Sequence, residues 1–493
     1  MNLKHSITTL RHNIATLRVG ECANALSLLA VALLAGVESH AGQRLPRVVV
    51  SVAIDGLRTD MLEAFMPLYG EGGFRLLMNR GSVYSNADYP AYEPNRASSV
   101  ATLATGSVPY DHGILDLHWL SRSTLRPVFC VEDSRQQGLN TTEQLSPCKL
   151  AVSTLGDELK VSTGGQGLVY SFAPFSDAAI LGAGHAADGA YWLDDKSNLW
   201  AGTTYYSASL PAWVEAVNSR LRSEQPSPTV SVNSRVADMA SSCFRYTTVG
   251  NDEVPDYIAL TLTALQPEQT ASSAYVELDQ TLSTIISAAE NTVGSDNALI
   301  IVTSTGTAEP EAANLDAYRI PTGNFYIDRT ANLLNMMLMA VYGEGNYVEA
   351  IYDNQIYLNH KLIEQKQLSM AEVLDRCQEL LLQSEGVKDA YSSQRLMLGA
   401  WTPDISRLRN SYNPRLSGDI LVQVAPGWQL VNETAKYSKP VRESCVSFPI
   451  ILYGLDVEAR EVRTPVTTDC IAPTLAGFMR IRAPNACRSS ALP

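Results

Sequence analysis

Polar side chains follow three apolar runs that have the composition of buried strands. Asp55 closes the run 48–54, Gln266 directly follows the run 257–265, and Thr305 lies among the hydroxyl residues that end the run 298–302. In an open parallel sheet, ligands bind beyond the carboxyl ends of the strands. An acidic residue at such an end is a common metal or phosphate-site residue, and it is equally common as a turn or cap residue. The strand ends are therefore where chemistry is expected.

A fourth candidate segment is the start of a short helix predicted over 96–106. Arg96, Ser98 and Ser99 fall in its first turn, directly after the break Glu93-Pro94-Asn95. A serine hydroxyl needs a neighbouring base to act as a nucleophile. No such base is evident in the sequence, and small hydroxyl residues in a first helical turn are usually caps or packing residues.

The elements that must position these residues alternate along the chain. Strands are predicted at 47–55, 257–265, 298–306 and 448–454, and helices at 59–81, 96–106 and 275–289. Unbroken β-branched runs are typical of strands that are buried on both faces of a sheet. The alternation predicts an α/β fold whose central sheet is mostly parallel, with helices on both faces.

Between 320 and 435 the sequence no longer follows this alternation of buried strands and helices. An extended stretch at 347–359, an amphipathic helix at 370–384 and a strand at 419–424 indicate an inserted α+β subdomain. The core then has two parts, 46–319 and 436–493.

Composition limits the class of protein. The 493 residues are 45% hydrophobic and 18% charged, which suits a large folded core of two to four structural units. The net charge of −14 argues against nucleic acid as a partner, because that partner needs a basic surface.

The first 41 residues have the pattern of a secretory signal peptide. Three basic residues precede an apolar stretch at 23–37, and Ser39-His40-Ala41 has the small residues of a cleavage site. Export to the periplasm or cell envelope is predicted, with no transmembrane segment in the mature chain. The alternative is an uncleaved N-terminal anchor.

Export makes disulfides plausible, because they persist in an oxidising compartment. Eight cysteines, less Cys22 in the predicted leader, leave an odd count of seven, so at least one thiol is free or pairs with another chain. Cys130 with Cys148, and Cys470 with Cys487, are the closest in sequence. A Cys130–Cys148 disulfide is predicted to close a surface loop.

Several motifs in order along the chain carry a resemblance to a known family. They are VAIDGLRTDML from Val52, TGSVPYDHGI from Thr105, ILGAGHAADGAYW from Ile180, SGDILVQVAPGW from Ser417 and DCIAPTLAGF from Asp469. The chain resembles the alkaline-phosphatase superfamily, and within it the bacterial alkaline phosphatases of the nucleotide pyrophosphatase/phosphodiesterase type. The resemblance covers nearly all of the mature chain and implies the α/β fold.

The resemblance also implies a two-zinc hydrolase, in which a Thr or Ser at a helix N-terminus attacks phosphorus. The first metal ligand matches Asp55. The nucleophile, ten residues before Gly106, matches Arg96, which cannot attack phosphorus. A lysine and an arginine of the family match Phe175 and Asp177.

The remaining ligand positions of the family have no match in this chain. The segments 264–269, 303–307 and 435–440 contain no aspartate or histidine where the resemblance would place them. Seven histidines, less three in the leader, leave four, and three of these lie in motifs outside the metal site. Only His118 is left over, so we expect that the dizinc site is lost and that no cofactor is bound.

Alternatives remain for Arg96. Its guanidinium either occupies the vacated metal space beside Asp55 or lies on the surface of a shifted turn. A different alignment would put Tyr92 at the nucleophile position. Glu309, Glu311 and Asp256 could form a new metal cluster with Asp55, although solvated carboxylates are favoured. Two functions follow: a non-catalytic protein that binds an envelope protein or an unknown ligand, or a phosphoester hydrolase with a rebuilt site.

Overall fold

The computed structural model describes residues 44–223, 231–264, 269–306, 319, 321–399, 402–440 and 446–493. Residues 45–493 form one compact unit. The predicted leader, Gln266, Glu309, Glu311 and Cys445 lie outside the described residues. Within the described ranges, no helix is long and apolar enough to cross a membrane.

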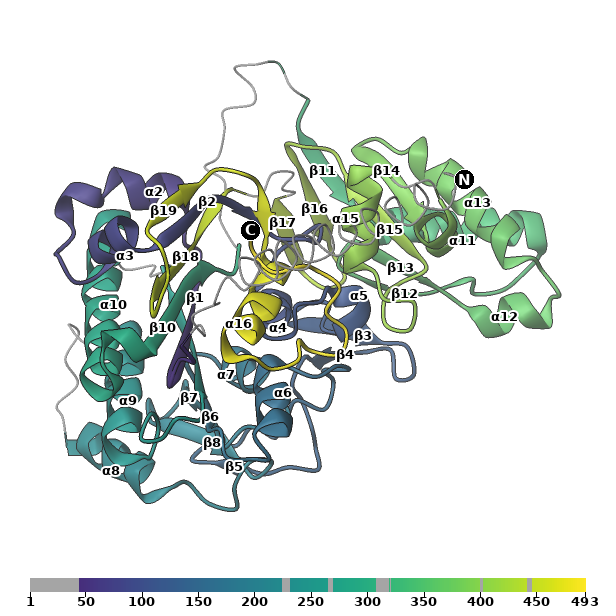
Figure 1. The fold of residues 1–493 in the computed structure, drawn as a ribbon. Coiled ribbons are helices and arrows are strands. Elements are labelled where there is room, and N and C mark those ends of the chain that lie inside the picture. The colour runs from purple at the N-terminus through teal and green to yellow at the C-terminus, as the bar shows by residue number, and fades with distance from the viewer. Residues whose placement is uncertain are drawn as a thin grey trace, which may run out of the picture. The chain divides into compact units, whose positions relative to one another are not determined.

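An 11-stranded sheet forms the centre of this unit (Figure 1). Its parallel middle consists of β10 (Ala298–Ser304), β1 (Val48–Asp55), β9 (Asp256–Thr263), β6 (Val169–Ala173) and β7 (Gly189–Leu193). Antiparallel pairings add β18 (Phe448–Gly454) and β2 (Ser82–Asp88) on one side, and β8 (Trp200–Thr203) and β5 (Gly138–Leu139) on the other. The short strands β19 (Arg460–Val462) and β20 (Val466–Thr467) pair with β2 in parallel. The predicted fold class is confirmed.

Burial on both faces explains why the middle strands are apolar throughout. Alternate residues of β1 face two different clusters: Val50 and Val52 belong to one, and Val49 and Ala53 to the other. The first cluster is closed by α9 (Val232–Tyr246) and α10 (Ala271–Val293), and the second by α6 (Leu155–Ser162) and α16 (Ile471–Met479). A third cluster includes α4 (Arg96–Thr105) and α7 (Ser176–Ala183). The core also contains the shorter α5 (Pro109–His112) and the amphipathic α8 (Ala212–Ser223).

The helix predicted over 59–81 is wrong as a single element. The chain instead forms α2 (Thr59–Ala64), the 3-10 helix η1 (Met66–Leu68) and α3 (Phe74–Arg80). Pro67 lies in the first turn of η1, where its missing N–H and fixed φ end the preceding helix. Gly73 directly precedes α3, and a Cβ there would lie 2.3 Å from the carbonyl oxygen of Asp279. The apolar residues of this segment have helical spacing, but Pro67 and Gly73 prevent one continuous helix from forming.

Residues 323–440 contain two smaller sheets with a hydrophobic cluster of their own. One sheet joins β11 (Gly323–Tyr326), β16 (Trp428–Asn432) and β17 (Tyr437–Pro440), and the other joins β12 (Val348–Tyr352), β13 (Gln355–Leu358), β15 (Ile420–Val424) and β14 (Val387–Ser392). Their helices are α11 (Ile327–Tyr342), α12 (His360–Gln365), α13 (Met370–Leu382), α14 (Ser393–Leu398) and α15 (Pro403–Ser411). The stretch predicted as extended over 347–359 is the β12–β13 hairpin. The boundaries of an inserted subdomain at 320 and 435 stay a prediction, and β17 runs beyond the second of them.

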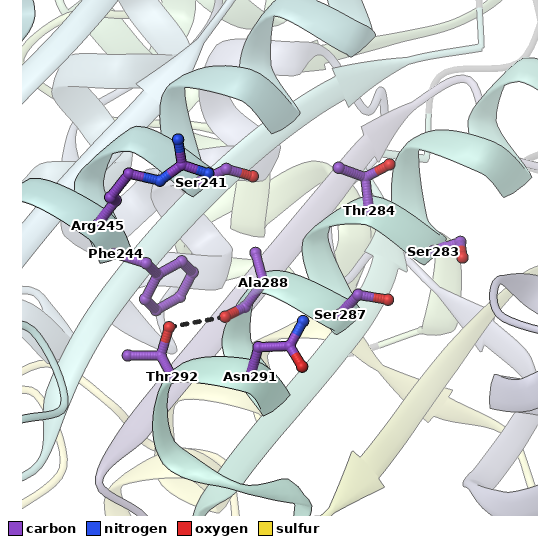
Figure 2. A pocket seen from close by; sticks show the side chains of 9 residues that line it. All are labelled: Ser241, Phe244, Arg245, Ser283, Thr284, Ser287, Ala288, Asn291 and Thr292. Atoms are coloured by element: carbon purple, nitrogen blue, oxygen red, sulfur yellow. Dashed lines mark hydrogen bonds between the residues drawn. The ribbon is translucent and has the colours of Figure 1, made fainter.

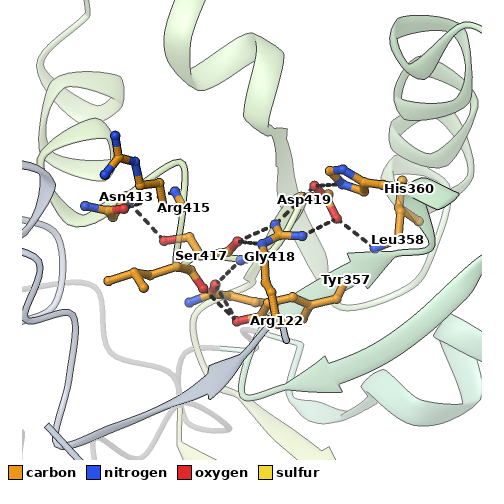
Figure 3. Close-up of polar contacts among 11 residues, drawn as sticks. Arg122, Tyr357, Leu358, His360, Asn413, Arg415, Ser417, Gly418 and Asp419 are labelled. Carbon is orange, nitrogen blue, oxygen red and sulfur yellow. Dashed lines mark hydrogen bonds and ion pairs between the residues drawn. The ribbon is translucent and has the colours of Figure 1, made fainter. Parts of the chain in front are cut away.

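One buried carboxylate ties these smaller sheets to the core (Figure 3). Arg122, which follows β3 (His118–Ser121) of the hairpin with β4 (Arg126–Phe129), donates to both Asp419 oxygens at 3.1 and 3.2 Å. Leu358 N–H donates to Asp419 at 2.7 Å, and His360 Nε2 lies 2.8 Å from its other oxygen. Burial raises the pKa of Asp419, but the bonds from His360 and Arg122 outweigh it, so the pKa lies below its usual value.

This network predicts a pH dependence of stability. The bond to Asp419 raises the pKa of His360 above 6.5, despite partial burial. A raised folded-state pKa gives stability that is complete below about pH 6.5 and lost as the pH rises through the folded value. Because the His360 side chain is 56% exposed, we expect its ion pair with Asp419 to contribute less than about 1 kcal/mol to the free energy of unfolding. At about pH 5.5 the wild-type protein should have a higher melting temperature than the His360→Gln variant. At about pH 8.5 the two melting temperatures should be equal. In an Asp419→Asn background, His360→Gln should have no pH-dependent effect, and a persisting effect would contradict the prediction.

The predicted Cys130–Cys148 disulfide is not formed in the structure, where both thiols are free. Cys130 is buried in the cluster that includes Trp119 and Val131. Cys148 is exposed, and its Sγ donates to the carbonyl of Glu132. Closeness in sequence did not determine where the two side chains point. Among the described cysteines, Cys470 and Cys487 are also free.

Candidate functional site

Asp55 lies at the carboxyl edge of the parallel strands, as expected. It is the last residue of β1, and the register places it beside Thr263 of β9, while its neighbour Ile54 pairs with Ser304 of β10. Its carboxylate is buried and accepts a 2.6 Å hydrogen bond from the Thr305 hydroxyl. The structure therefore brings Asp55 and Thr305 together.

Arg96 approaches Asp55 from the start of α4. The side chain of Asn95 caps this helix by accepting from Ser98 N–H, and this fixes Arg96 in the first turn. Arg96 Nη1 lies 4.0 Å from Asp55 Oδ2, at the outer limit of an ion pair. The position matches the interpretation in which the guanidinium lies beside Asp55, and the side chain is only 20% exposed.

The principal partner of Arg96 is Asp177, in the first turn of α7. Nε and Nη2 each donate to one Asp177 oxygen at 2.9 Å, which is the paired geometry that a guanidinium and a carboxylate favour. The Asp177 side chain is 3% exposed. The Phe175 ring stacks against the guanidinium in a cation–π contact, with its centroid 3.7 Å from Arg96 Cζ.

The electrostatics of this cluster hold Arg96 charged. Burial disfavours the guanidinium cation, but the hydrogen bonds and charge of Asp177, together with the charge of Asp55, outweigh it and raise the Arg96 pKa. Two buried carboxylates thus share one cation. An arginine that is protonated and hydrogen-bonded in this way can serve as neither base nor nucleophile.

The candidate nucleophiles are buried or hydrogen-bonded to other parts of the chain. Ser98 and Ser99 are buried within α4, and the Ser98 hydroxyl accepts a hydrogen bond from Tyr89. Tyr92 lies toward β15, where its hydroxyl accepts from Gln423 at 2.8 Å. These contacts favour the packing interpretation over displaced catalysis.

A metal cluster of Asp55 with Asp256 is ruled out by the register. Asp256 begins β9 and pairs with Val48, whereas Asp55 pairs with Thr263, seven residues further along the same strand. At about 3.3 Å per residue the two carboxylates are about 23 Å apart. Glu309 and Glu311 lie outside the described residues, as does Gln266.

Comparisons with known proteins identify the family. Residues 49–444 match the family described as type I phosphodiesterase / nucleotide pyrophosphatase. The chain belongs to this family. It is 24% identical to alkaline phosphatase PafA of Elizabethkingia meningoseptica, over 93% of this chain and 96% of that protein. It is 26% identical to a protein named calcium-transporting ATPase of Myroides odoratus (89% and 93%) and 24% identical to alkaline phosphatase PhoV of Synechococcus elongatus (89% and 91%).

The fold agrees with this assignment. A crystal structure of wild-type PafA superposes with a TM-score of 0.80 at 23% identity, covering 91% of this chain and 98% of the other. The predicted membership of the phosphodiesterase-type branch of the alkaline-phosphatase superfamily is therefore confirmed.

The donor set around Asp55 does not fit the two zinc ions that the resemblance implies. One Asp55 oxygen accepts from a hydroxyl and the other faces the Arg96 cation, which would repel a metal ion. Across the described ranges, no group of three or more His, Cys, Asp or Glu side chains could hold a metal. Lys439, in the segment where the resemblance would place a zinc histidine, instead pairs with Asp353 at 2.6 Å.

A cavity of about 260 Å³ opens beside the Arg96–Asp177 pair. Its wall includes Glu143 and Lys196, neither of which the sequence singled out, as well as Trp192. Trp192 Nε1 donates to Glu143 at 3.2 Å. Burial and the neighbouring carboxylates raise the Glu143 pKa, although the Trp192 bond opposes this. No motif or spacing marks Glu143, so only the folded arrangement could reveal it.

A larger hollow, about 580 Å³, lies between α9 and α10 (Figure 2). Three of its hydroxyls, on Ser241, Thr284 and Thr292, donate to carbonyls of their own helices. Its one charged wall residue is Arg245. Without a carboxylate or histidine in its wall, this surface offers no acid–base pair, and we do not assign it as the site.

Proposed function

We propose that this protein is a non-catalytic member of the type I phosphodiesterase family, with a binding or scaffold role in the cell envelope. One observation carries the proposal: the family's nucleophile position holds Arg96, whose guanidinium donates two hydrogen bonds to Asp177 along one edge and faces Asp55. A hydrolase of this kind needs a nucleophile and a Lewis acid at that point. At that point this chain has an arginine that is already paired with one carboxylate and lies beside a second.

Charge adds support. A phosphoryl group carries negative charge, and an enzyme that transfers it places cations around it. Here the position of a family arginine holds the buried carboxylate of Asp177, and the Arg96 guanidinium is already paired with that carboxylate. The cleft is thus poorly suited to a phosphate ester.

The envelope assignment rests on the predicted signal peptide. We propose a periplasmic or envelope location, and as partner another envelope protein or an unidentified ligand.

The competing candidate is a phosphoester hydrolase with a rebuilt site. The names of the relatives favour it, because two of them are alkaline phosphatases. The cavity with Glu143 and Lys196 is where such a site would have to lie.

An assay of the purified protein separates the two candidates. With p-nitrophenyl phosphate and bis(p-nitrophenyl) phosphate, with and without added zinc, we expect turnover no higher than that of an Asp55→Ala variant purified in parallel. This control removes the retained ligand residue. Turnover that Asp55→Ala keeps but Glu143→Gln lowers would also overturn the proposal, because neither substitution affects a contaminating phosphatase. Metal analysis should find well under one zinc per chain. Zinc-dependent turnover that Asp55→Ala abolishes, or about two zinc ions per chain, would overturn the proposal.

A further inference from the structure

Helix α11 has a second apolar face in addition to the one that packs on the smaller sheets. Leu334 and Leu338 are fully buried in the hydrophobic cluster of those sheets. Elsewhere on the same helix, Leu333, Met336 and Val341 are 48%, 58% and 47% exposed. A surface helix normally has one apolar stripe and a polar outer face. We call this exposed surface the α11 patch, and its residues are Leu333, Met336, Ala340 and Val341.

The spacing of the α11 patch is that of a helix-packing seam. Leu333, Met336 and Ala340 recur at intervals of three and four residues, and Val341 follows directly. Residues at this spacing form one stripe along a helix, which the matching stripe of a second helix can cover. Ala340 is small and lets two helix backbones approach each other. Single apolar residues on a surface need no explanation, but a contiguous group of them indicates a contact surface.

The α11 patch is free of charge in a strongly acidic chain. From Thr330 to Tyr342 the sequence contains no charged residue, although the chain as a whole has a net charge of −14. An acidic partner would be repelled by the chain, and a basic partner would find no carboxylate on the patch to pair with. A neutral apolar face is complementary to itself. Charge therefore favours a second copy of this chain as the occupant.

The charges at the two ends of the α11 patch are already compensated within the chain. At the start of α11, Arg329 pairs with Glu433 at 2.5 Å. At its end, Arg376 of α13 donates to the hydroxyl of Tyr342 and pairs with Glu372 at 3.3 Å. Two copies that meet at this patch thus bring no uncompensated like charges together at either pair.

A membrane surface matches the α11 patch less well. Helices that lie in a membrane interface have lysines and arginines on their polar face, which meet anionic lipids. Arg329 is the one basic residue of α11, and its guanidinium is already bound by Glu433.

We propose that the α11 patch is a self-association surface, on which α11 of a second copy packs antiparallel across a two-fold axis near Met336. A two-fold contact uses the same residues on both sides, so no second surface is needed. The antiparallel arrangement also opposes the two helix dipoles. With one helix from each copy, the contact is at the small end of specific interfaces, and we expect a reversible dimer with a Kd of roughly 10–100 µM. No residue of the Arg96 cluster takes part, so the proposal stands whether or not the protein is a hydrolase.

Sedimentation equilibrium of the purified protein, at about 1 to 300 µM, tests this proposal. The average mass should rise with concentration toward twice that of one chain. Met336→Lys brings two like charges together near the axis and should weaken the dimer at least about tenfold. Val161→Lys, the matched control, changes a residue of α6 that is 73% exposed and should leave the dimer unchanged. Circular dichroism checks that each variant is folded. A wild-type protein that stays monomeric, or a dimer that Met336→Lys leaves unchanged, would overturn the proposal.

Cross-linking locates the contact. In a Cys148→Ser background, which removes an exposed thiol, Met336→Cys should form a disulfide-linked dimer with oxidised glutathione as the oxidant. Val161→Cys in the same background should not. Equal cross-linking of the two variants would contradict the placement of the axis and overturn the proposal. Flotation with phosphatidylcholine vesicles tests the other occupant: vesicle binding by wild type that Met336→Lys abolishes would assign the patch to a membrane instead.

Discussion

Replacing Arg96 by alanine is expected to lower the free energy of unfolding by about 3–5 kcal/mol. The reason is the pair of carboxylates left behind: the side chains of Asp177 and Asp55 are 3% and 8% exposed, and Arg96 is the cation that both face. Removing one partner of a buried ion pair leaves a buried charge without its counter-charge. The Phe175 ring also loses the guanidinium packed against it. Urea denaturation of both proteins at pH 7 measures the difference.

A matched control is Arg329→Ala. Arg329 also makes a two-point contact with a carboxylate, Glu433, but the two side chains are 62% and 47% exposed. Exposed pairs contribute about 0–1 kcal/mol, so this variant should unfold almost as wild type does. The double variant Arg96→Ala/Asp177→Ala should recover part of the loss, because one of the two carboxylates that lose the Arg96 cation is gone. A cost below about 1 kcal/mol for Arg96→Ala would show that the cluster is hydrated and that the ion pair is not what closes the site.

The central sheet could be predicted from the sequence because its strands are buried on both faces. Unbroken β-branched runs leave few alternatives, and β1, β9 and β10 lie within one or two residues of the predicted strands. The segment 59–81 failed for a local reason: its apolar spacing is helical, but Pro67 and Gly73 interrupt the backbone. The direction in which a side chain points is even harder to predict from the sequence. Nothing in the spacing of Cys130 and Cys148 indicates that one is buried and the other exposed.

The candidate site was predictable in part. Its location at the strand ends followed from Asp55, and the contact of Asp55 with Thr305 follows from the pairing of β1 with β10. The principal partner of Arg96 was missed because Asp177 is 81 residues away and is brought near by α7, which no local pattern places. A signal was nevertheless present. The resemblance assigns both positions to one active site, so an arginine at the first and an aspartate at the second are expected to face each other.

Restoring a hydroxyl at the nucleophile position is expected to leave the protein inactive. Arg96→Thr supplies the attacking group that the resemblance implies, yet the described residues contain no group of three or more His, Cys, Asp or Glu side chains that could hold a metal to ionise it or to stabilise the leaving oxygen. Among the described residues, Asp55 is the one carboxylate at a ligand position that the resemblance implies. A single carboxylate does not hold zinc tightly. The Asp177 carboxylate, now without its cation, would also repel a phosphate ester.

The measurement compares Arg96→Thr with Arg96→Ala, which creates the same space without a hydroxyl. Both should hydrolyse p-nitrophenyl phosphate at the rate of the Asp55→Ala blank, with and without zinc. Each metal contribution is worth several kcal/mol to the transition state, and about 1.4 kcal/mol corresponds to a tenfold rate, so the deficit amounts to several orders of magnitude. Zinc-dependent turnover in Arg96→Thr above that of Arg96→Ala would mean that a metal site survives near α4. The arginine alone would then have been blocking an otherwise competent hydrolase.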